Sequence, residues 1–294
     1  MTILEPATRS QRVAAWLPAI AALAVAPVAL AGTPINERAP ADPAGKVEVS
    51  NTAGSVVVTA WPRSEIEVTG TLGTGTERLE FSRVEQLTRV KVILPKQSSR
   101  VESTHLVVKV PAGSSVSVNT VSADVRAQGV QGSQRLQSVS GDIQTEAAAE
   151  DVECKTVSGN VMVTGSGQRA LLTVTTVSGD ATVSRVAGEV NGNTVSGNFT
   201  VAMGDTVRSR LRSSSGDLGL KGRLVPDSRI DFEGPVGAEF DVSSFNGDIR
   251  NCFGPKAVRT SEYAPGSELR FHEGQGSGRV RIKTLNGNIS ICNK

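Results

Sequence analysis

Aromatic residues are scarce in this chain. Phe, Trp and Tyr make up only 3% of the 294 residues, whereas Gly occurs 30 times. A core built around bulky rings is therefore excluded, and the composition favours thin layers of β-branched side chains in an extended β architecture. The formal net charge is only +2, so no preference for nucleic acid or for another polyanion is expected.

Groups that could support catalysis or metal binding are also few. The only histidines are His105 and His272, and neither has a Cys, Asp or Glu at metal-ligand spacing, although Glu273 adjoins the second. No G-x-S-x-G elbow joins a strand to a helix, and Gly165-Ser166-Gly167 is expected to be a loop. We therefore expect no catalytic residue, no metal site and no cofactor.

The N-terminus has the pattern of an export signal. Arg9 and Arg12 precede an Ala/Leu/Val-rich stretch over residues 13–30, and Ala29-Leu30-Ala31 forms an A-x-A cleavage site. An N-terminal membrane anchor is the alternative, but Pro18 and Pro27 interrupt the stretch, and this favours cleavage. No second segment is long enough to span a bilayer, so the mature chain is expected to be exported and to be periplasmic or associated with the cell envelope.

A tripeptide of the form Ser-Gly-Asp/Asn returns along the chain. Its glycines between residues 141 and 216 are separated by 18, 20, 18 and 19 residues, which indicates one unit of about two strands laid down repeatedly. These residue types predict the corner between two strands, with glycine at positive φ and polar side chains bonded to nearby backbone. The predicted turn residues are Gly141, Asp142, Gly159, Asn160, Gly179, Asp180, Gly197, Asn198, Gly216, Asp217, Gly247, Asp248, Gly287 and Asn288.

The Asp and Asn residues of this repeat would stack as one ladder that begins at Asp124. Closely spaced carboxylates can bind calcium or act as an acid and a base, so both are alternatives to a structural turn. Asn interrupts the row of carboxylates repeatedly, and the doubled glycines of the nonapeptide calcium repeat are missing. The structural turn is the favoured interpretation.

Apolar columns flank each turn. The residue after each Asp or Asn is apolar and is predicted to face inward, while Thr182 and Thr200 alternate outward. The columns three residues before and three residues after the Asp or Asn are also expected to point mostly into the core. The column before the turn residue comprises Val121, Val139, Val157, Val177, Val195, Ser214, Phe245 and Leu285, and the column after it comprises Ala127, Thr145, Val163, Val183, Val201, Leu220, Asn251 and Ile291.

Stacking such units about 4.8 Å apart turns the columns into continuous apolar ladders. We therefore predict an all-β, single-domain β-solenoid, similar to a parallel β-helix, with rungs of about 18–20 residues. The expected organisation is a signal peptide over residues 1–31, a Pro/Ala-rich linker over 32–45 and the β-solenoid domain over 46–294. Within this domain, residues 46–120 would form wider N-terminal coils, 121–220 the regular rungs, and 221–294 extended C-terminal coils with an added strand or hairpin.

Two basic rows lie at identical offsets before their turn glycines and suggest a polyanion-binding face. They are Arg208, Arg210 and Arg212, and Arg279, Arg281 and Lys283. The intervening rung places Glu239, Asp241 and Ser243 at the same offsets, and Glu189 begins an earlier rung. If these rungs stack, acidic rows separate the basic rows and form cross-strand pairs, which is the favoured interpretation.

Cysteine spacing indicates one disulfide. Cys252 and Cys292 each follow a turn glycine by five residues, so they occupy the same column of the final two rungs. Equivalent Cα atoms of adjacent strands are about 4.8 Å apart, which a disulfide accepts, and export supplies an oxidising compartment. We therefore predict a Cys252–Cys292 disulfide and a free thiol at Cys154, with two unbridged apolar cysteines as the alternative.

The repeated V-S-G-[DN]-hydrophobic units, the exported N-terminus and the closing R-V-R-I-K-T-L-N-G-N-I-S-I segment resemble the DUF4097 "putative adhesin" family of exported bacterial β-strand repeat proteins. This resemblance covers roughly residues 46–292. It implies a location in the cell envelope and adhesion or envelope sensing, and it supplies no catalytic residues. The expected function is a noncatalytic adhesin or binding scaffold whose partner is an envelope glycan or a surface protein, and the alternative is a glycan lyase or hydrolase on a β-helix.

Overall fold

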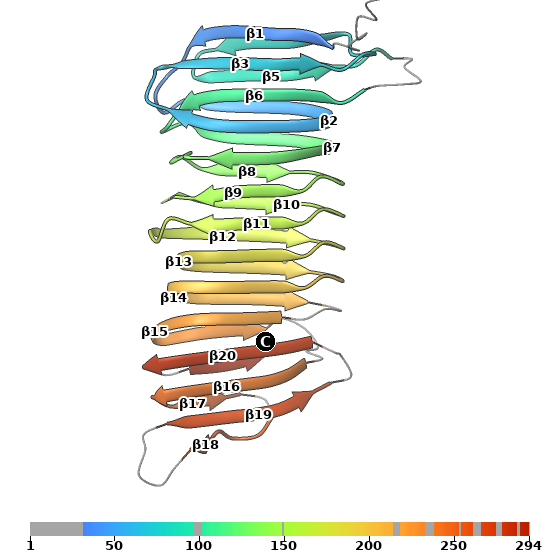
Figure 1. Ribbon diagram of the computed structural model, residues 1–294. Coiled ribbons are helices and arrows are strands. Elements are labelled where there is room, and N and C mark those ends of the chain that lie inside the picture. Colours follow the sequence, from blue (N-terminus) through green and yellow to red (C-terminus); the bar gives the residue numbers. More distant parts are fainter. Residues whose placement is uncertain are drawn as a thin grey trace, which may run out of the picture. The chain divides into compact units, whose positions relative to one another are not determined.

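The structure is a computed structural model that describes residues 32–96, 102–148, 150–213, 218–232, 238–252, 254–260, 266–274, 278–286 and 289–293. These ranges lie in one compact unit that runs from Ala31 to Lys294. Within them the fold is all-β, which confirms that part of the prediction, and Figure 1 shows strands following one another in a stack. Across the same ranges, no helix is long and apolar enough to cross a membrane.

The strands fall into four groups along the chain. The first group is β1 (Thr33–Pro40), β2 (Lys46–Trp61), β3 (Glu65–Leu72), β4 (Arg78–Val84), β5 (Leu87–Ile93) and β6 (Thr104–Pro111). The second is β7 (Ser115–Gln128), β8 (Gln134–Gln137), β9 (Ile143–Ala147), β10 (Val152–Lys155), β11 (Val161–Gly165) and β12 (Arg169–Thr176). The third is β13 (Ala181–Thr194), β14 (Phe199–Ser213) and β15 (Leu218–Phe232), and the last is β16 (Ala238–Asn246), β17 (Ile249–Asn251), β18 (Val258–Arg259), β19 (Ser267–Glu273), β20 (Gly278–Asn286) and β21 (Ile289–Asn293).

Each regular rung has two strand segments joined by the Gly-Asp/Asn corner. Segments that follow the corner form a first face, in which β9 and β11 pair in parallel with parts of β7 and β13. Segments that precede the corner form a second face, in which β8, β10 and β12 pair in parallel with parts of β7 and β13. Because the register repeats from rung to rung, equivalent residues lie side by side in columns.

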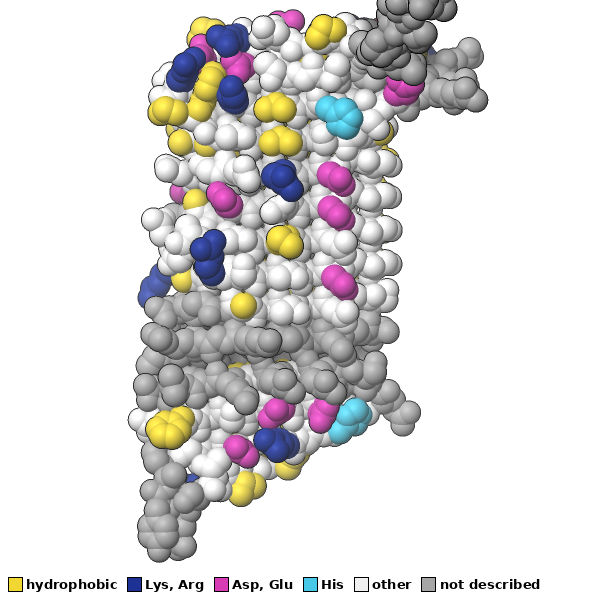
Figure 2. Space-filling model, in the orientation of Figure 1, with side chains coloured by type: hydrophobic (Ala, Val, Ile, Leu, Met, Phe, Trp, Pro, Cys, Tyr) yellow, Lys and Arg dark blue, Asp and Glu magenta, His cyan; other side chains and the backbone are white. Residues whose placement is uncertain are grey.

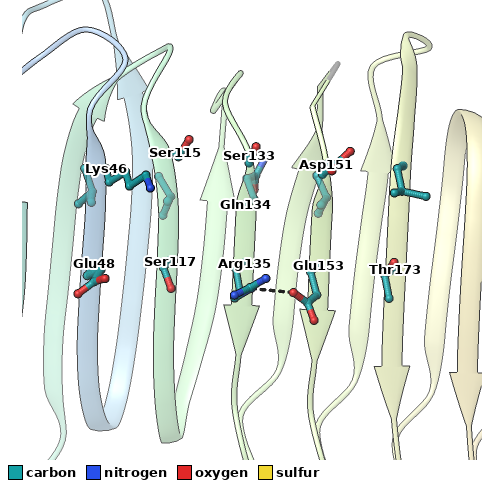
Figure 3. Close-up of a pocket in the computed structure, with 14 residues that line it drawn as sticks. Lys46, Glu48, Ser115, Ser117, Ser133, Gln134, Arg135, Asp151, Glu153 and Thr173 are labelled. Atoms are coloured by element: carbon teal, nitrogen blue, oxygen red, sulfur yellow. Dashed lines mark hydrogen bonds and ion pairs between the residues drawn. The ribbon is translucent and has the colours of Figure 1, made fainter. Parts of the chain in front are cut away.

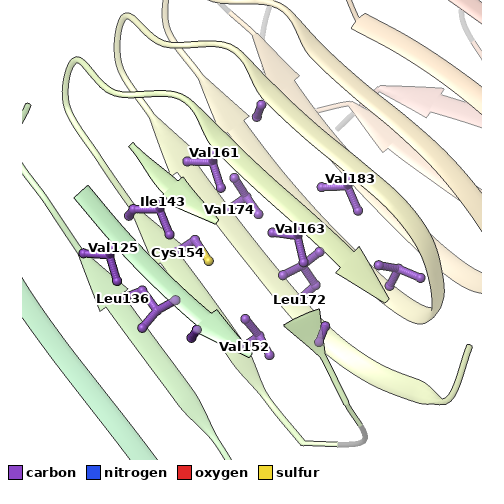
Figure 4. Packing of buried hydrophobic residues seen from close by; sticks show 14 of the residues in the cluster. Val125, Leu136, Ile143, Val152, Cys154, Val161, Val163, Leu172, Val174 and Val183 are labelled. Carbon is purple, nitrogen blue, oxygen red and sulfur yellow. The ribbon is translucent and has the colours of Figure 1, made fainter. Parts of the chain in front are cut away.

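The core lies between the two faces (Figure 4). The described side chains of the column that follows each Asp or Asn are buried, as predicted, and Val161 is only 1% exposed. Most described residues of the column three positions after the Asp or Asn are buried as well, with Val163 and Val183 at 0% exposure, whereas Asn251 is partly exposed. On the opposite face, Leu136, Cys154 and Leu172 complete the packing. Period-two alternation therefore places these two columns correctly.

The column three residues before the Asp or Asn was predicted to point inward, and this prediction is wrong. Its described members are exposed by 38% to 66% of their surface, and they are Val121, Val139, Val157, Val177, Val195 and Phe245. The chain bends between the two faces at these positions, so the alternation stops there. The buried position at the corner belongs to the preceding residue, for example Thr156 before Val157.

The N-terminal strands close one end of the sheet with antiparallel pairs. Residues 32–45 were predicted to be a linker, whereas Thr33–Pro40 form β1, which pairs antiparallel with β3. Ile35 of β1 is buried, and the Arg38 guanidinium contacts the carboxylate of Glu67, which also accepts a hydrogen bond from Lys109 Nζ at 2.8 Å. The Lys109 hydrogen bond is the main cause that lowers the pKa of Glu67. The ion pair between Arg38 and Glu67 and the buried side chain of Ile35 thus hold this Pro-containing segment against the sheet.

The C-terminal strands do not stack in chain order. β21 pairs in parallel with β15 on one side and with β17 on the other, and β20 pairs in parallel with β16. The last rung of the chain, β20–β21, is therefore inserted before the rung β16–β17. β19 adds antiparallel to β16, and the short β18 pairs with β19, in agreement with an added strand in this region.

Candidate functional site

Close backbone approach explains the corner glycines. A Cβ atom at Gly141, Gly159, Gly179 or Gly197 would overlap the carbonyl oxygen of the residue stacked beneath it. None of these four residues has a positive φ, so the predicted reason for glycine is wrong at these positions, although Gly247 has φ 155°. The corner requires glycine because successive rungs leave no room for a side chain there.

The Asp and Asn side chains form a ladder of hydrogen bonds along the corners. The N–H of Asp142 donates to Asp124 Oδ1 at 2.9 Å, and the N–H of Asn160 donates to Asp142 Oδ1 at 2.7 Å. The same bond recurs from Asp180 to Asn160 at 3.0 Å and from Asn198 to Asp180 at 2.8 Å. One oxygen is all that each bond uses, and Asn supplies it as well as Asp does, so the described ladder needs no calcium. Gly216, Asp217, Gly287 and Asn288 lie outside the described residues.

Sequence reasoning missed a buried hydroxyl in the four corners at Gly141, Gly159, Gly179 and Gly197. The glycine N–H donates to the hydroxyl three residues earlier, at 2.8 Å from Gly141 to Ser138 Oγ and at 3.1 Å from Gly159 to Thr156 Oγ1. Thr176 and Thr194 accept in the same way. The signal was present in the sequence, since Ser or Thr occupies this position in each of these repeats.

A shallow groove of about 580 Å³ crosses the second face over β2, β7, β8, β10 and β12 (Figure 3). Its floor is formed by the small side chains of Ser115, Ser117 and Ser133. Lys46 and Glu48 stand on one side, and Lys46 extends toward Ser115. The hollow arises because the outward positions of β7 carry serine while both flanking strands carry long charged side chains.

Two rows of side chains cross this groove (Figure 3). The lower row contains Glu48, Ser117, Arg135, Glu153 and Thr173, and ion pairs fix its charged side chains. Arg135 Nε contacts Glu153 Oε2 at 2.7 Å, and Arg89 Nη2 contacts Glu48 Oε2 at 3.2 Å. Glu153 also pairs with Lys155, and this hydrogen bond is the main cause that lowers its pKa. Glu153 therefore stays ionised well below neutral pH.

The upper row of the groove keeps its polar groups available. Within the described residues, the hydroxyls of Ser115 and Ser133 in this row, and that of Ser117 in the lower row, make no hydrogen bond, and Lys46 and Asp151 make no ion pair. Lys46 and Asp151 lie on strands three pairings apart in the register, about 14 Å at the usual strand spacing. The groove thus offers a cation at one end, a carboxylate at the other and hydroxyls between them.

The basic rows lie beside acidic positions, as the favoured interpretation expected. The backbone register pairs Glu239 with Arg279 and Asp241 with Arg281, and it pairs Glu189 with Arg208. Asp241 also accepts an ion pair from Arg270 Nε at 3.2 Å. The inserted rung changes the order, however, because the acidic row of β16 lies between β20 and β19 rather than between the two basic rows.

The two histidines take no part in a metal cluster among the described residues. His105 Nδ1 lies 2.8 Å from Ser55 Oγ on the first face. The backbone register pairs His272 with Glu239. Figure 2 shows a broken column of acidic side chains below the upper of its two histidines.

The cysteines occupy two kinds of environment. Cys154 is a free thiol with 0% exposure, and burial raises its pKa to about 12, so it is an unreactive core residue. Cys252 is disulfide-bonded, and its N–H donates to the carbonyl of Ile291 at 2.9 Å. The side chain of Cys292 lies outside the described residues.

Comparison with known proteins gives one family and several solved structures. Residues 44–292 match the model of a family described as Toastrack DUF4097, and a search of curated proteins finds no match. A "putative adhesin" from Bacteroides fragilis is 9% identical, with 90% of this chain and 99% of that chain covered and a TM-score of 0.46.

Two further structures are similarly distant. A "putative cell adhesion protein" from Clostridium sporogenes is 10% identical over 89% of this chain and 100% of that chain, with a TM-score of 0.26. A "putative lipid binding protein" from Parabacteroides distasonis is 10% identical over 89% and 97%, with a TM-score of 0.38.

Proposed function

The chain belongs to the Toastrack DUF4097 family, and from that premise we propose that it is a noncatalytic exported protein of the cell envelope that acts as an adhesin or a binding scaffold. The family match confirms the resemblance drawn from the repeat motif. We further infer that the stacked parallel rungs constitute a β-solenoid, that residues 1–31 are a cleaved signal peptide, and that the domain extends to residue 294. The first 31 residues lie outside the described part of the chain.

The groove on the second face carries the proposal of binding. Its unpaired groups, Lys46, Asp151 and three serine hydroxyls, are those that hydrogen-bond a polar, hydroxyl-rich ligand. The groove runs across the strands, so a linear ligand would meet one new set of groups at each rung, about every 4.8 Å. An envelope glycan fits this pattern, and a polar segment of a surface protein is the other partner class.

The state of Glu48 and Glu153, two of the three groove carboxylates, favours binding over glycan cleavage. A glycosidase needs one carboxylic acid with a raised pKa to protonate the leaving group. Glu153 has the opposite property, because Lys155 and Arg135 lower its pKa. Glu48 is engaged by Arg89.

Binding through the groove can be tested by filling it. Ser117→Tyr places a ring on the groove floor, and Thr182→Tyr places the same ring on an exposed position of the first face as the matched control. On an array of bacterial surface glycans, we expect Ser117→Tyr to weaken binding by at least 10-fold and Thr182→Tyr to leave it unchanged. Equal binding by both variants would contradict the groove assignment, and release of reducing or unsaturated sugars would favour the alternative of a carbohydrate-active enzyme.

A Cys252–Cys292 disulfide is part of the proposal. Register pairs Asn251 with Ile291, so positions 252 and 292 follow as the next neighbours along β17 and β21. Replacing both cysteines by Ser should lower the free energy of unfolding by about 3–4 kcal/mol, because the bridge closes a loop of about 40 residues in the unfolded chain. Peptide mapping of the exported protein without reductant should recover the two cysteines in one linked peptide, and alkylation of both as free thiols would disprove the bridge.

A further inference from the structure

An exposed row of valines runs along the corners of five consecutive rungs. Their side chains are exposed by 38% to 48%, although valine is usually buried. We call Val121, Val139, Val157, Val177 and Val195 the valine stripe. The stripe is independent of the groove on the second face, and neither the core nor the corner hydrogen bonds require its side chains to be apolar.

The stripe is held in fixed register by the backbone beside it. The N–H of Ser140 donates to the carbonyl of Val121 at 2.8 Å, and the N–H of Ser158 donates to the carbonyl of Val139 at 2.9 Å. The same bond recurs from Ser178 to Val157 and from Ser196 to Val177, each at 2.8 Å. The valines are thus repeated at the strand spacing of about 4.8 Å. Figure 1 shows the corners lying one above another.

The two flanks of the stripe differ in charge. The ladder on the first-face side carries Asp124, Asp142 and Asp180, all exposed, and Asn at its other two positions. Within the five rungs of the stripe, the row on the second-face side holds a single cation, Lys155, whose side chain is 48% exposed while it contacts Glu153. The remaining members of that row are the neutral residues Asn119, Gln137, Thr175 and Asn193.

From this pattern we propose that the valine stripe is a dimerisation surface whose occupant is the same stripe of a second copy of this chain. Only a surface with the same repeat stays in register along the whole stripe. An α-helix has a pitch of about 5.4 Å, so it drifts by about 0.6 Å per rung. Identical side chains at an identical spacing stay opposite one another along the whole stripe without such drift, as the stacked strands of paired sheets do in steric zippers.

Charge selects the relative direction of the two copies. A twofold axis parallel to the stack places the Asp row of one copy against the Lys155 row of the other, with Lys155 opposite Asn160 and between Asp142 and Asp180. A twofold axis perpendicular to the stack would place Asp row against Asp row, which like charges disfavour. The acidic row also disfavours an anionic membrane as the occupant. The dimer is therefore parallel.

The area of the stripe sets the strength of this contact. At these exposures each valine offers roughly 70 Å², or about 350 Å² per copy, which is the size of a functional surface patch. The valines of two copies thus contribute about 700 Å², and the flanking polar rows bring the interface only near the lower limit of specific interfaces. We expect a reversible dimer with a dissociation constant in the micromolar range.

The oligomeric state of the purified exported protein tests this inference. Sedimentation equilibrium between 5 and 500 µM should show a monomer–dimer equilibrium. The triple variant Val139→Ser/Val157→Ser/Val177→Ser should weaken it by at least 10-fold, while circular dichroism and melting temperature stay near those of the wild type. Serine is the natural residue of this column at position 214. The control is Met162→Ser/Leu171→Ser, which removes two comparably exposed apolar side chains away from the stripe and should leave the equilibrium unchanged.

Cross-linking tests the direction. Val121→Cys lies at one end of the stripe, so in a parallel dimer it meets its own counterpart and should form a disulfide-linked dimer on mild oxidation. In an antiparallel dimer, Val121→Cys would cross-link only to Val195→Cys of another copy. That result would overturn the parallel arrangement.

Other outcomes would overturn the second copy as occupant. They are a monomer at every concentration, a dimer that survives the triple Ser variant, and a monomer that binds through the stripe to phosphatidylglycerol vesicles or to an amphipathic Leu/Lys helical peptide.

Discussion

Replacing Val161 by Asp should abolish the native fold. Val161 is 1% exposed and lies in register between Ile143 and Ala181 in the column that follows each corner. A carboxylate at this position would be buried without a partner, which costs several kcal/mol and consumes much of the stability of an ordinary domain. We expect no cooperative thermal transition near that of the wild type, as measured by circular dichroism at 218 nm.

The matched control for this variant is Thr182→Asp. Thr182 pairs in register with Met162, the neighbour of Val161, but it faces solvent. An exposed substitution of this kind changes the free energy of unfolding by about 0.5 kcal/mol or less. Equal melting temperatures for the two variants would show that the inward column is wrongly assigned.

Gly159→Ala is expected to be the second most damaging change. The added Cβ would overlap the carbonyl oxygen of Gly141 in the adjacent rung, and that atom is backbone and cannot move aside as a side chain would. The rungs would have to separate, which strains the bond from Ser158 N–H to the carbonyl of Val139. Overpacking of this kind costs about 3 kcal/mol, measurable by denaturant unfolding.

A further pair of variants separates close approach from backbone conformation as the reason for glycine. If a left-handed φ were required, Gly159→Asn would be tolerated better than Gly159→Ala, since Asn adopts that region readily. Close approach predicts that Asn is at least as damaging as Ala. Ser158→Ala, at the exposed neighbouring position, should remain within about 0.5 kcal/mol of the wild type.

The repeat allowed the sequence to predict the strands and two of the three apolar columns. Period-two alternation identifies Val161 and Val163 as inward because both lie within one straight strand. It fails at Val157, because the chain turns between the two faces there and alternation carries no information about a bend. The apolar character of Val157 would be explained by an interface that a single sequence does not show.

The groove and the order of the last rungs could not be predicted in the same way. The groove depends on which strands become neighbours on the second face, and Ser117 and Arg135 are 18 residues apart in sequence yet paired in the sheet. The inserted rung joins Ile230 to Ile291 across the chain, and no local pattern encodes this pairing. The strand β1 could not be predicted from composition, because the Pro/Ala-rich segment was expected to be a linker. Ile35 is its one buried side chain, among prolines and charged residues.

The inserted rung has a consequence for how the protein is made. The rungs up to β15 pair with strands that precede them, so they can assemble in chain order, N-terminus first. β16 and β17 cannot complete their pairing when they are made. Their neighbours on the side of β15 are β20 and β21, which come later in the chain and must insert between β15 and the rung β16–β17. Loss of β20 and β21 would therefore remove a layer from within the stack rather than shorten its end, and it would expose two unpaired strand edges to the cell's proteases.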